Sequence, residues 1–120
     1  MLVKAVLESA EFSKLIKKNR SKDKIIKGCR NTLLSFKFSN NPPTTCLLHD
    51  CNICQIWKFR IPNPNANKGL SAGLRLFAYF KKDNSTFYLY KIYQKNEVDK
   101  ISNIEQLIKE EILKILQKSI

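Results

Sequence analysis

The order of apolar and polar residues around position 57 predicts a β-strand with two unlike faces. In the stretch WKFRI, Trp57, Phe59 and Ile61 alternate with Lys58 and Arg60. Successive side chains of a strand point to opposite faces of a sheet, so the apolar residues share one face and the two cations share the other. For one strand taken alone, the ordinary interpretation is a sheet with one face in solvent. A face built to bind an anion is the alternative.

Two more strands are predicted after this one, at Gly73–Phe80 and Thr86–Tyr93, and the short polar turn KKDNS joins them as a hairpin. Near the N-terminus, Leu2–Leu7 is a short apolar segment that is compatible with a strand. With Asn52–Ile61 they predict a four-stranded, largely antiparallel sheet. Arg75 alternates with aliphatic residues, so it can share a face with the two cations of WKFRI.

Apolar residues at helical spacing predict three helices. The first covers residues 10–20, with Ser9 as its N-cap. The second covers residues 22–36, and most of its cations lie outside the apolar stripe. The link between these two helices is short, so we expect an antiparallel helical hairpin. The pattern Ser102-x-x-Glu105 predicts a capping box at the start of a C-terminal amphipathic helix.

The length of the chain fits one domain, so we expect a single α+β domain over residues 1–120. Hydrophobic residues make up 43% of the chain, which is enough for a packed core. No apolar run has the length of a membrane span, and the N-terminal stretch MLVKAVLESAEF carries charges where a signal peptide needs apolar residues. The sequence therefore predicts a cytoplasmic protein that does not bind a membrane.

The charge balance predicts an anionic partner. The chain has 22 Lys and Arg against 10 Asp and Glu, a formal net charge of +12. Residues 97–120 hold four lysines and five acidic residues, so the positive charge belongs to the part of the chain before them. A folded domain this basic most often binds nucleic acid, although an anionic membrane surface or an acidic protein would satisfy the same charge.

The cysteines are the candidate metal ligands. Cys46, Cys51 and Cys54 lie close together in CLLHDCNIC with the single histidine, His49, while Cys29 belongs to a helical segment. This spacing is compressed for a zinc finger, and the chain has no second Cys-x2-Cys pair, so reduced structural thiols are favoured and zinc is the alternative. One histidine cannot fill both positions of a two-histidine ribonuclease, so we expect a structural role for it.

Two stretches resemble a known family. The stretch KFRIPNPNANKGLSAGLRL is similar to a pattern of the RelE/ParE superfamily of bacterial type II toxins, in its HigB-like subset, that consists of Lys-x-Arg, a glycine-containing loop and Gly-x-Arg. The stretch IYQKNE is similar to the Tyr-x-Lys-x-Glu ending of the same family. The resemblance spans most of the chain, and before residue 46 it is one of layout alone. It implies a RelE-like fold and an mRNA interferase, an endoribonuclease that cleaves mRNA on the ribosome without a cofactor. It also implies a cognate antitoxin as partner, for which the basic surface predicts an acidic or amphipathic segment.

The resemblance also implies roles for individual residues. Metal-independent RNA cleavage needs a base for the 2′-hydroxyl, an acid for the leaving 5′-oxygen, and cations around the phosphorane. Arg60 and Arg75 match the family's basic positions and are assigned to the phosphate. Lys58 is assigned to proton transfer, since crowding by other cations favours a neutral lysine. Lys95 is assigned to the leaving oxygen or a phosphate, and Lys68 to the RNA backbone.

Tyr79 and Tyr93 are candidates for stacking on a base, although an aromatic residue in a sheet more often belongs to the core. The sequence departs from some family members near Asn96 and Ile101, where those members carry an arginine and a tyrosine that are not present here. Two other function classes stay open. One is a non-catalytic basic toxin of the same superfamily that acts on another target such as a topoisomerase, and the other is an RNA-binding zinc module.

Overall fold

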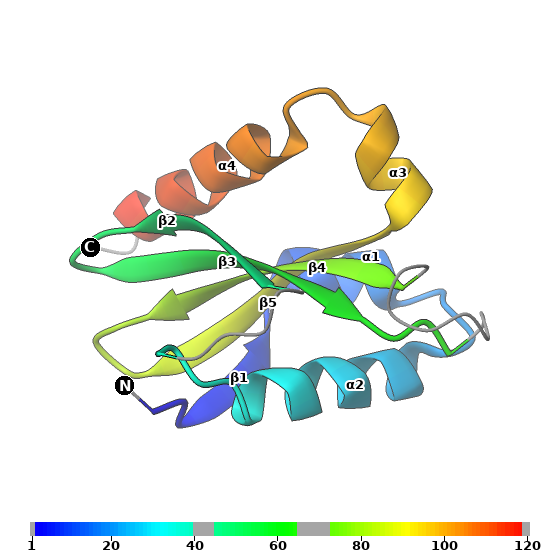
Figure 1. The fold of residues 1–120 in the computed structure, drawn as a ribbon, viewed down its shortest axis with the longest axis horizontal. Coiled ribbons are helices and arrows are strands. Elements are labelled where there is room, and N and C mark those ends of the chain that lie inside the picture. The colour runs from blue at the N-terminus through cyan, green and yellow to red at the C-terminus, as the bar shows by residue number, and fades with distance from the viewer. Residues whose placement is uncertain (1, 40–44, 65–72, 119–120) are drawn as a thin grey trace.

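A computed structural model describes residues 2–39, 45–64 and 73–118 of the protein. In chain order the elements are β1 (Ala5–Glu8), α1 (Ala10–Ile16), α2 (Lys22–Leu34), β2 (Thr45–Asp50), β3 (Cys54–Ile61), β4 (Leu74–Lys81), β5 (Thr86–Gln94), α3 (Lys95–Lys100) and α4 (Ile104–Lys118). The fold is α+β, with a mixed sheet between α1 and α2 on one face and α4 on the other (Figure 1). No helix of the described residues is long and apolar enough to cross a membrane.

The strands of the described residues form one five-stranded sheet in the order β1-β5-β4-β3-β2. β1 runs parallel to β5, and the other three pairings are antiparallel, as the sequence predicts for most of the sheet. The prediction of four strands is wrong, because Thr45–Asp50 adds an edge strand on β3. The apolar and polar residues of this segment, TCLLHD, do not alternate regularly, so its sequence does not predict a strand. The irregularity agrees with the register shift in its pairing with β3, between Leu47 and His49.

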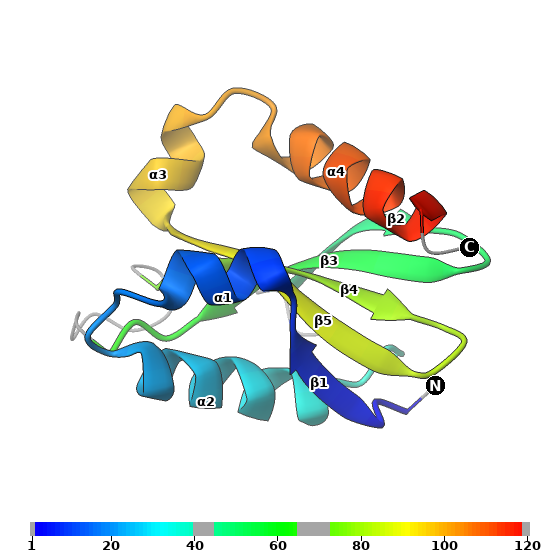
Figure 2. The same ribbon diagram turned by 180° about the vertical axis from the view of Figure 1, so that it is seen from behind.

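The helical hairpin covers one face of the sheet, and Figure 2 shows α1 and α2 running in opposite directions. The Ser9 side chain accepts a hydrogen bond from the backbone amide of Phe12 at 3.1 Å, which confirms it as the N-cap of α1. The core on this side joins the helices to the odd-numbered residues of β3. Its fully buried members include Phe12, Leu33, Phe59 and Phe87. We call it the hairpin-side core.

α4 covers the other face of the sheet and forms a second core there, which we call the α4-side core. Ile108 and Ile112 of the helix are buried together with Ile56 and Phe77 of the sheet. The helix begins at Ile104, so the predicted cap at Ser102 is wrong. The capping box of this region instead opens α3, a short helix that the sequence did not predict, with Gln94 as its N-cap and Glu97 as its partner.

A β-bulge in β5 decides which of its residues face α4. Phe77 of β4 pairs with Lys91, and the next residue, Ala78, pairs with Leu89, so Tyr90 is the extra residue of β5. Tyr90 and Lys91 both reach Glu111 of α4. Two neighbouring residues of β5 therefore lie on one face, which strict alternation does not allow.

Candidate functional site

Two arginines lie directly opposite each other on two inner strands of the sheet, near the end of each strand. Arg60 of β3 and Arg75 of β4 are register partners, and both lie on the α4 face with Phe77. Like charges directly opposite on one face of a sheet destabilise it, so the fold retains an arrangement that an anion between the two guanidinium groups would relieve. Arg60 is exposed, whereas the exposed fraction of Arg75 is 6%. The pair therefore has one fixed member and one that reaches solvent.

The surroundings of Arg75 hold it in place. Its Nη1 donates a hydrogen bond to the backbone carbonyl of Gly73 at 3.0 Å. Burial lowers the pKa of the Arg75 guanidinium, the like charge of Arg60 lowers it further, and the Asp99 carboxylate acts in the opposite direction. Because arginine stays protonated in proteins, the result is a permanent, partly desolvated cation. Such a cation interacts more strongly with a phosphate than one in water does.

Two lysines extend the arginine pair by one row of the sheet. Lys58 and Lys91 are the register partners of Phe77 on its two sides, and the exposed fraction of each side chain is 26%. We call Lys58, Arg60, Arg75 and Lys91 the sheet cation cluster. The alternation of β3 and β4 predicts that the first three share a face, and the register agrees. Lys91 was not predicted, because the bulge beside it cannot be seen in the sequence.

α4 supplies a carboxylate to each lysine of the cluster. Glu105 forms an ion pair with Lys58, and Glu111 forms one with Lys91 at 3.1 Å. Crowding by cations predicts a role for Lys58 in proton transfer, but the charged group that contacts Lys58 is the Glu105 carboxylate. Glu105 is thus a second candidate for proton transfer that sequence reasoning missed. The helical pattern gave no signal for it, since both glutamates lie beside the apolar stripe of α4.

Glu111 is the centre of a small hydrogen-bond network. It accepts hydrogen bonds from the Tyr90 hydroxyl at 2.6 Å and from Lys91 Nζ at 3.1 Å. Burial acts to raise the pKa of the Glu111 carboxyl, but these two donors lower it below its ordinary value. Burial and the Glu111 carboxylate both raise the pKa of Tyr90. The network stabilises the ionised carboxylate and fixes the middle of α4 above β5.

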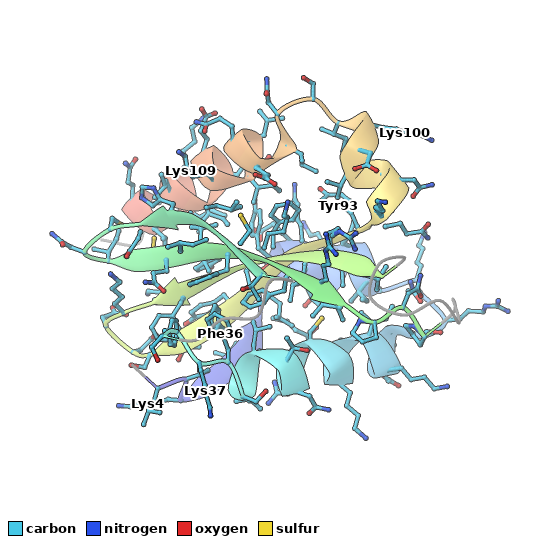
Figure 3. The ribbon with its side chains drawn as sticks, in the orientation of Figure 1. Lys4, Phe36, Lys37, Tyr93, Lys100 and Lys109 are labelled. Carbon is cyan, nitrogen blue, oxygen red and sulfur yellow. The ribbon has the colours of Figure 1, made fainter. Side chains whose placement is uncertain are left out.

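Tyr93 lies at the cluster, whereas Tyr79 does not. Tyr93 is the register partner of Arg75, is half-buried, and lies on the side of the sheet that α3 and α4 cover (Figure 3). The ring of Tyr79 is buried in the α4-side core and stacks on Tyr88 at a centroid distance of 5.2 Å. Burial raises the pKa of the Tyr79 hydroxyl to about 12. Tyr79 is therefore a core residue, and the expectation that its ring stacks on an RNA base is wrong because the ring is buried.

The other predicted residues lie around or outside the cluster. Lys95 is the first residue of α3 and is exposed, two residues after Tyr93, the register partner of Arg75. Asn96 follows it in α3 and is also exposed, and the exposed fraction of Ile101 is 39%. Lys68 lies outside the described residues. The structure therefore brings Lys58, Arg60, Arg75 and Tyr93 together and leaves Lys95 at the margin.

Comparison with protein-family models, with curated proteins and with solved structures finds no match.

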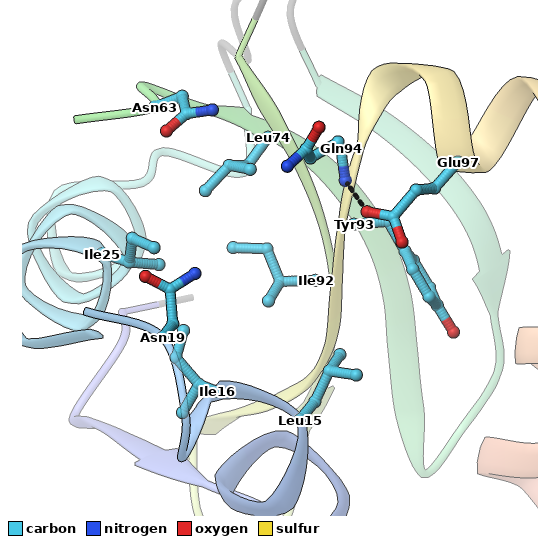
Figure 4. Close-up of a pocket in the computed structure, with 10 residues that line it drawn as sticks. All are labelled: Leu15, Ile16, Asn19, Ile25, Asn63, Leu74, Ile92, Tyr93, Gln94 and Glu97. Atoms are coloured by element: carbon cyan, nitrogen blue, oxygen red, sulfur yellow. Dashed lines mark hydrogen bonds between the residues drawn. The ribbon is translucent and has the colours of Figure 1, made fainter. Parts of the chain in front are cut away.

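A cavity of about 220 Å³ lies near the cluster but on the other side of β5. Its walls come from α1, α2 and the ends of β4 and β5, and include Ile16, Ile25 and Ile92 with the amides of Asn19 and Gln94 (Figure 4). The ring of Tyr93 points away from this space. Tyr93 is nevertheless one of the lining residues of the cavity, so the cavity adjoins the row of the sheet that holds the arginines.

The cysteine cluster does not form a metal site of the usual kind. The part of the chain that the structure describes contains no group of three or more His, Cys, Asp or Glu side chains placed to hold a metal ion. His49 lies half-buried on β2, and all four cysteines are free thiols. The reduced thiols stay a prediction, and the zinc alternative finds no group of three candidate ligands among the described residues.

Proposed function

We propose that the protein is the toxin of a type II toxin–antitoxin system, with a RelE-like fold and endoribonuclease activity on mRNA. The observation that carries the proposal is the directly opposed pair of Arg60 and Arg75, one exposed and one buried. Like charges directly opposite on one sheet face repel each other, and a phosphate between them accepts hydrogen bonds from both guanidinium groups. The resemblance of the sequence motifs supports the choice of this family of toxins. The net charge of +12 supports attraction to RNA of any sequence.

The chemistry of the proposed reaction follows from the groups of the cluster. The 2′-hydroxyl loses a proton and attacks the adjacent phosphorus, and the 5′-oxygen leaves with a proton. Arg60 and Arg75 stabilise the charge that grows on the phosphorane oxygens, so they lower the barrier more than they bind the ground state. The Lys58–Glu105 pair lies one row away and supplies an acceptor and a donor of protons. Tyr93 lines the same row as the arginines.

α4 takes part in the proposal because its carboxylates compete with phosphate. Glu105 and Glu111 neutralise Lys58 and Lys91 in the free protein, whereas Arg60 remains exposed. RNA therefore meets the arginine pair first, and Lys58 becomes available as the phosphate displaces Glu105. An acidic segment of a cognate antitoxin would bind the same cations and exclude RNA by charge. Ribosomal mRNA and the antitoxin are both proposed partners.

A second candidate function is a binding toxin of the same superfamily without cleavage, directed at another target such as a topoisomerase. What favours it is the make-up of the sheet cation cluster. Four cations are sufficient to dock a polyanion, whereas cleavage needs an acid–base pair in addition. The two candidates differ in one measurable result, the appearance of new RNA ends.

Primer extension after brief expression of the protein tests the proposal. Wild type is compared with Arg60→Gln and with the matched control Arg20→Gln, whose exposed arginine lies in the α1–α2 link. We expect new in-frame breaks in transcripts with wild type and with the control. They should fall by about 100-fold with Arg60→Gln and disappear when translation is blocked.

Other outcomes separate the candidates. Growth arrest without new RNA ends would support the binding toxin. Breaks that persist at full level in Arg60→Gln would show that the arginine pair is not the site. Wild-type protein that neither arrests growth nor cleaves RNA would reject both candidates. Circular dichroism of Arg60→Gln confirms that the variant is folded, which its exposed position makes the expected result.

A further inference from the structure

Two thiols face each other across the turn between β2 and β3. Cys51 and Cys54 flank the two residues of the turn, and their Sγ atoms are 3.7 Å apart. The backbone amide of Cys51 donates a hydrogen bond to the carbonyl of Cys54 at 3.0 Å, which holds the two residues opposite each other. Opposed residues of a hairpin have Cα atoms about 4.5–5.5 Å apart, within the range that a disulfide needs. Neither the proposed function nor any metal site uses this pair.

The two thiols differ in exposure and in acidity. Cys51 is half-buried, whereas Cys54 is completely buried in the α4-side core. Burial acts to raise the pKa of the Cys51 thiol, but backbone amides, the Cys54 thiol and the Lys82 ammonium together lower it below its ordinary value. Burial raises the pKa of Cys54 to about 12. Cys51 is therefore the thiol that meets a reagent first, and Cys54 is its protected neighbour.

We propose that Cys51 and Cys54 are a reversible thiol–disulfide site for low-molecular-weight disulfides such as oxidised glutathione. The Cys51 thiolate attacks one sulfur of the glutathione disulfide and releases one glutathione thiolate, which leaves a mixed disulfide on Cys51. The Cys54 thiol then loses its proton to solvent and attacks the Cys51 sulfur. The second glutathione leaves as a thiolate and takes up a proton. The pair loses two electrons in all, and oxidised glutathione gains them.

The other cysteines of the chain do not offer this chemistry. Cys46 is exposed on β2, and the hydrogen bond of its thiol goes to the Leu47 carbonyl rather than to another sulfur. Cys29 is buried in α2, and burial raises its pKa to about 12. Only the Cys51–Cys54 pair combines an accessible thiol with a second sulfur in contact among the described residues.

The site lies at one end of the core that holds α4. Cys54 belongs to the same buried cluster as Ile112 and Leu116 from the C-terminal half of that helix. Formation of the disulfide brings the sulfurs from 3.7 Å to a bond of about 2.05 Å, so it changes the packing beneath α4. The proposal does not depend on the proposed function, because the reaction involves the thiols alone.

Intact-mass measurement after treatment with oxidised glutathione tests the proposal, in a Cys46→Ser background that removes the unpaired exposed thiol. We expect the folded protein to lose two titratable thiols and the mass of two hydrogens, with no bound glutathione, and dithiothreitol to reverse both changes. Cys54→Ala should instead keep one glutathione on Cys51, and Cys51→Ser should gain none. Cys51→Ser is the matched control, since it retains the buried thiol.

Two results would overturn the proposal. One is a parent protein that keeps all its thiols under conditions that oxidise a glutathione-reactive dithiol standard. The other is a parent protein that ends as a stable glutathione adduct without closing the disulfide. The decision rests on the protein with both cysteines present, so it stands even where Cys54→Ala is too unstable to purify.

Discussion

At the scale of single residues, the protein places two like charges, those of Arg60 and Arg75, on opposed positions of neighbouring strands, which destabilises a sheet. Arg60 faces Arg75 across two strands, and the exposed Arg60 has solvent beside it while Arg75 is nearly buried. Lys58, one row away, is instead neutralised by Glu105. Two arginines placed directly opposite each other, one of them buried, favour a site for an external anion, because a phosphate accepts hydrogen bonds from both guanidinium groups.

Glu105→Gln separates the two roles that the carboxylate has in the proposal. Removal of the negative charge frees Lys58, so RNA should bind several-fold more tightly at low salt. Removal of the proton acceptor should at the same time slow cleavage by about 100-fold. Filter binding and single-turnover cleavage of the same RNA measure the two effects. Faster cleavage together with tighter binding would show that Glu105 acts as a competitor of phosphate and not as a base.

At the scale of elements, α4 is held to the sheet mainly by apolar packing. Its buried face carries Ile104, Ile108, Ile112 and Leu116, all 7% exposed or less. The ion pairs of Glu105 and Glu111 are partly exposed, and such pairs contribute about 0–1 kcal/mol each. The carboxylates therefore tune what the cations bind, while the isoleucines determine whether the helix stays in place.

Ile112→Ala tests this division. The side chain is fully buried, so its truncation should lower the free energy of unfolding by about 2–5 kcal/mol. Leu107→Ala is the matched control on the same helix, because Leu107 is 47% exposed and should change stability by less than about 0.5 kcal/mol. Urea denaturation followed by the fluorescence of Trp57 measures both. Equal effects of the two substitutions would contradict the packing of α4 described above.

The network of Glu111 predicts an acid-sensitive contribution to stability. Its carboxyl pKa is lowered in the folded state below the ordinary 4.5, so the folded state favours the ionised form. The contribution is complete above the pKa of the unfolded chain and is lost as the pH falls through the lower folded value. Glu111→Gln should therefore flatten the fall of the urea midpoint below pH 4.5. Glu110→Gln, at the exposed neighbour, should leave the curve of the wild type unchanged.

At the scale of the whole molecule, the basic charge is a long-range property of the part before residue 97. That part holds 18 basic and five acidic residues, whereas residues 97–120 hold four and five. Exposed cations also follow the α1–α2 side, so the field that attracts RNA is broader than the sheet cation cluster. Attraction to RNA and positioning of one phosphate are therefore separate properties of this protein.

Salt dependence distinguishes these two properties. Binding to single-stranded RNA should weaken linearly in a plot of log affinity against log salt concentration, because each phosphate contact releases counterions. Arg60→Gln should reduce the magnitude of the slope by about 0.7, the value for one phosphate contact on a single strand. Fluorescence anisotropy over a range of salt concentrations measures the slopes. An unchanged slope would mean that Arg60 does not touch a phosphate.

Most of the candidate site could be predicted from the sequence, because it depends on alternation within strands. Lys58, Arg60 and Arg75 lie on one face for the same reason that Trp57 and Phe59 lie on the other. The prediction that Tyr79 contacts RNA is wrong because alternation predicts the face on which a residue lies but not which element covers that face. In the structure α4 covers that end of the sheet and buries the ring.

The sequence by itself determined the α+β composition, the helical hairpin with its Ser9 cap, the central strands and the cationic face, since each depends on periodicity or capping over a few residues. The tertiary structure decided the rest. The register of β4 and β5 and the bulge in β5 place Lys91 in the cluster. Pairing with β3 makes Thr45–Asp50 a strand, and the packing of α4 on the sheet places Glu105, 47 residues along the chain, in contact with Lys58. Contacts between distant segments have no local signature, because they depend on how whole elements pack.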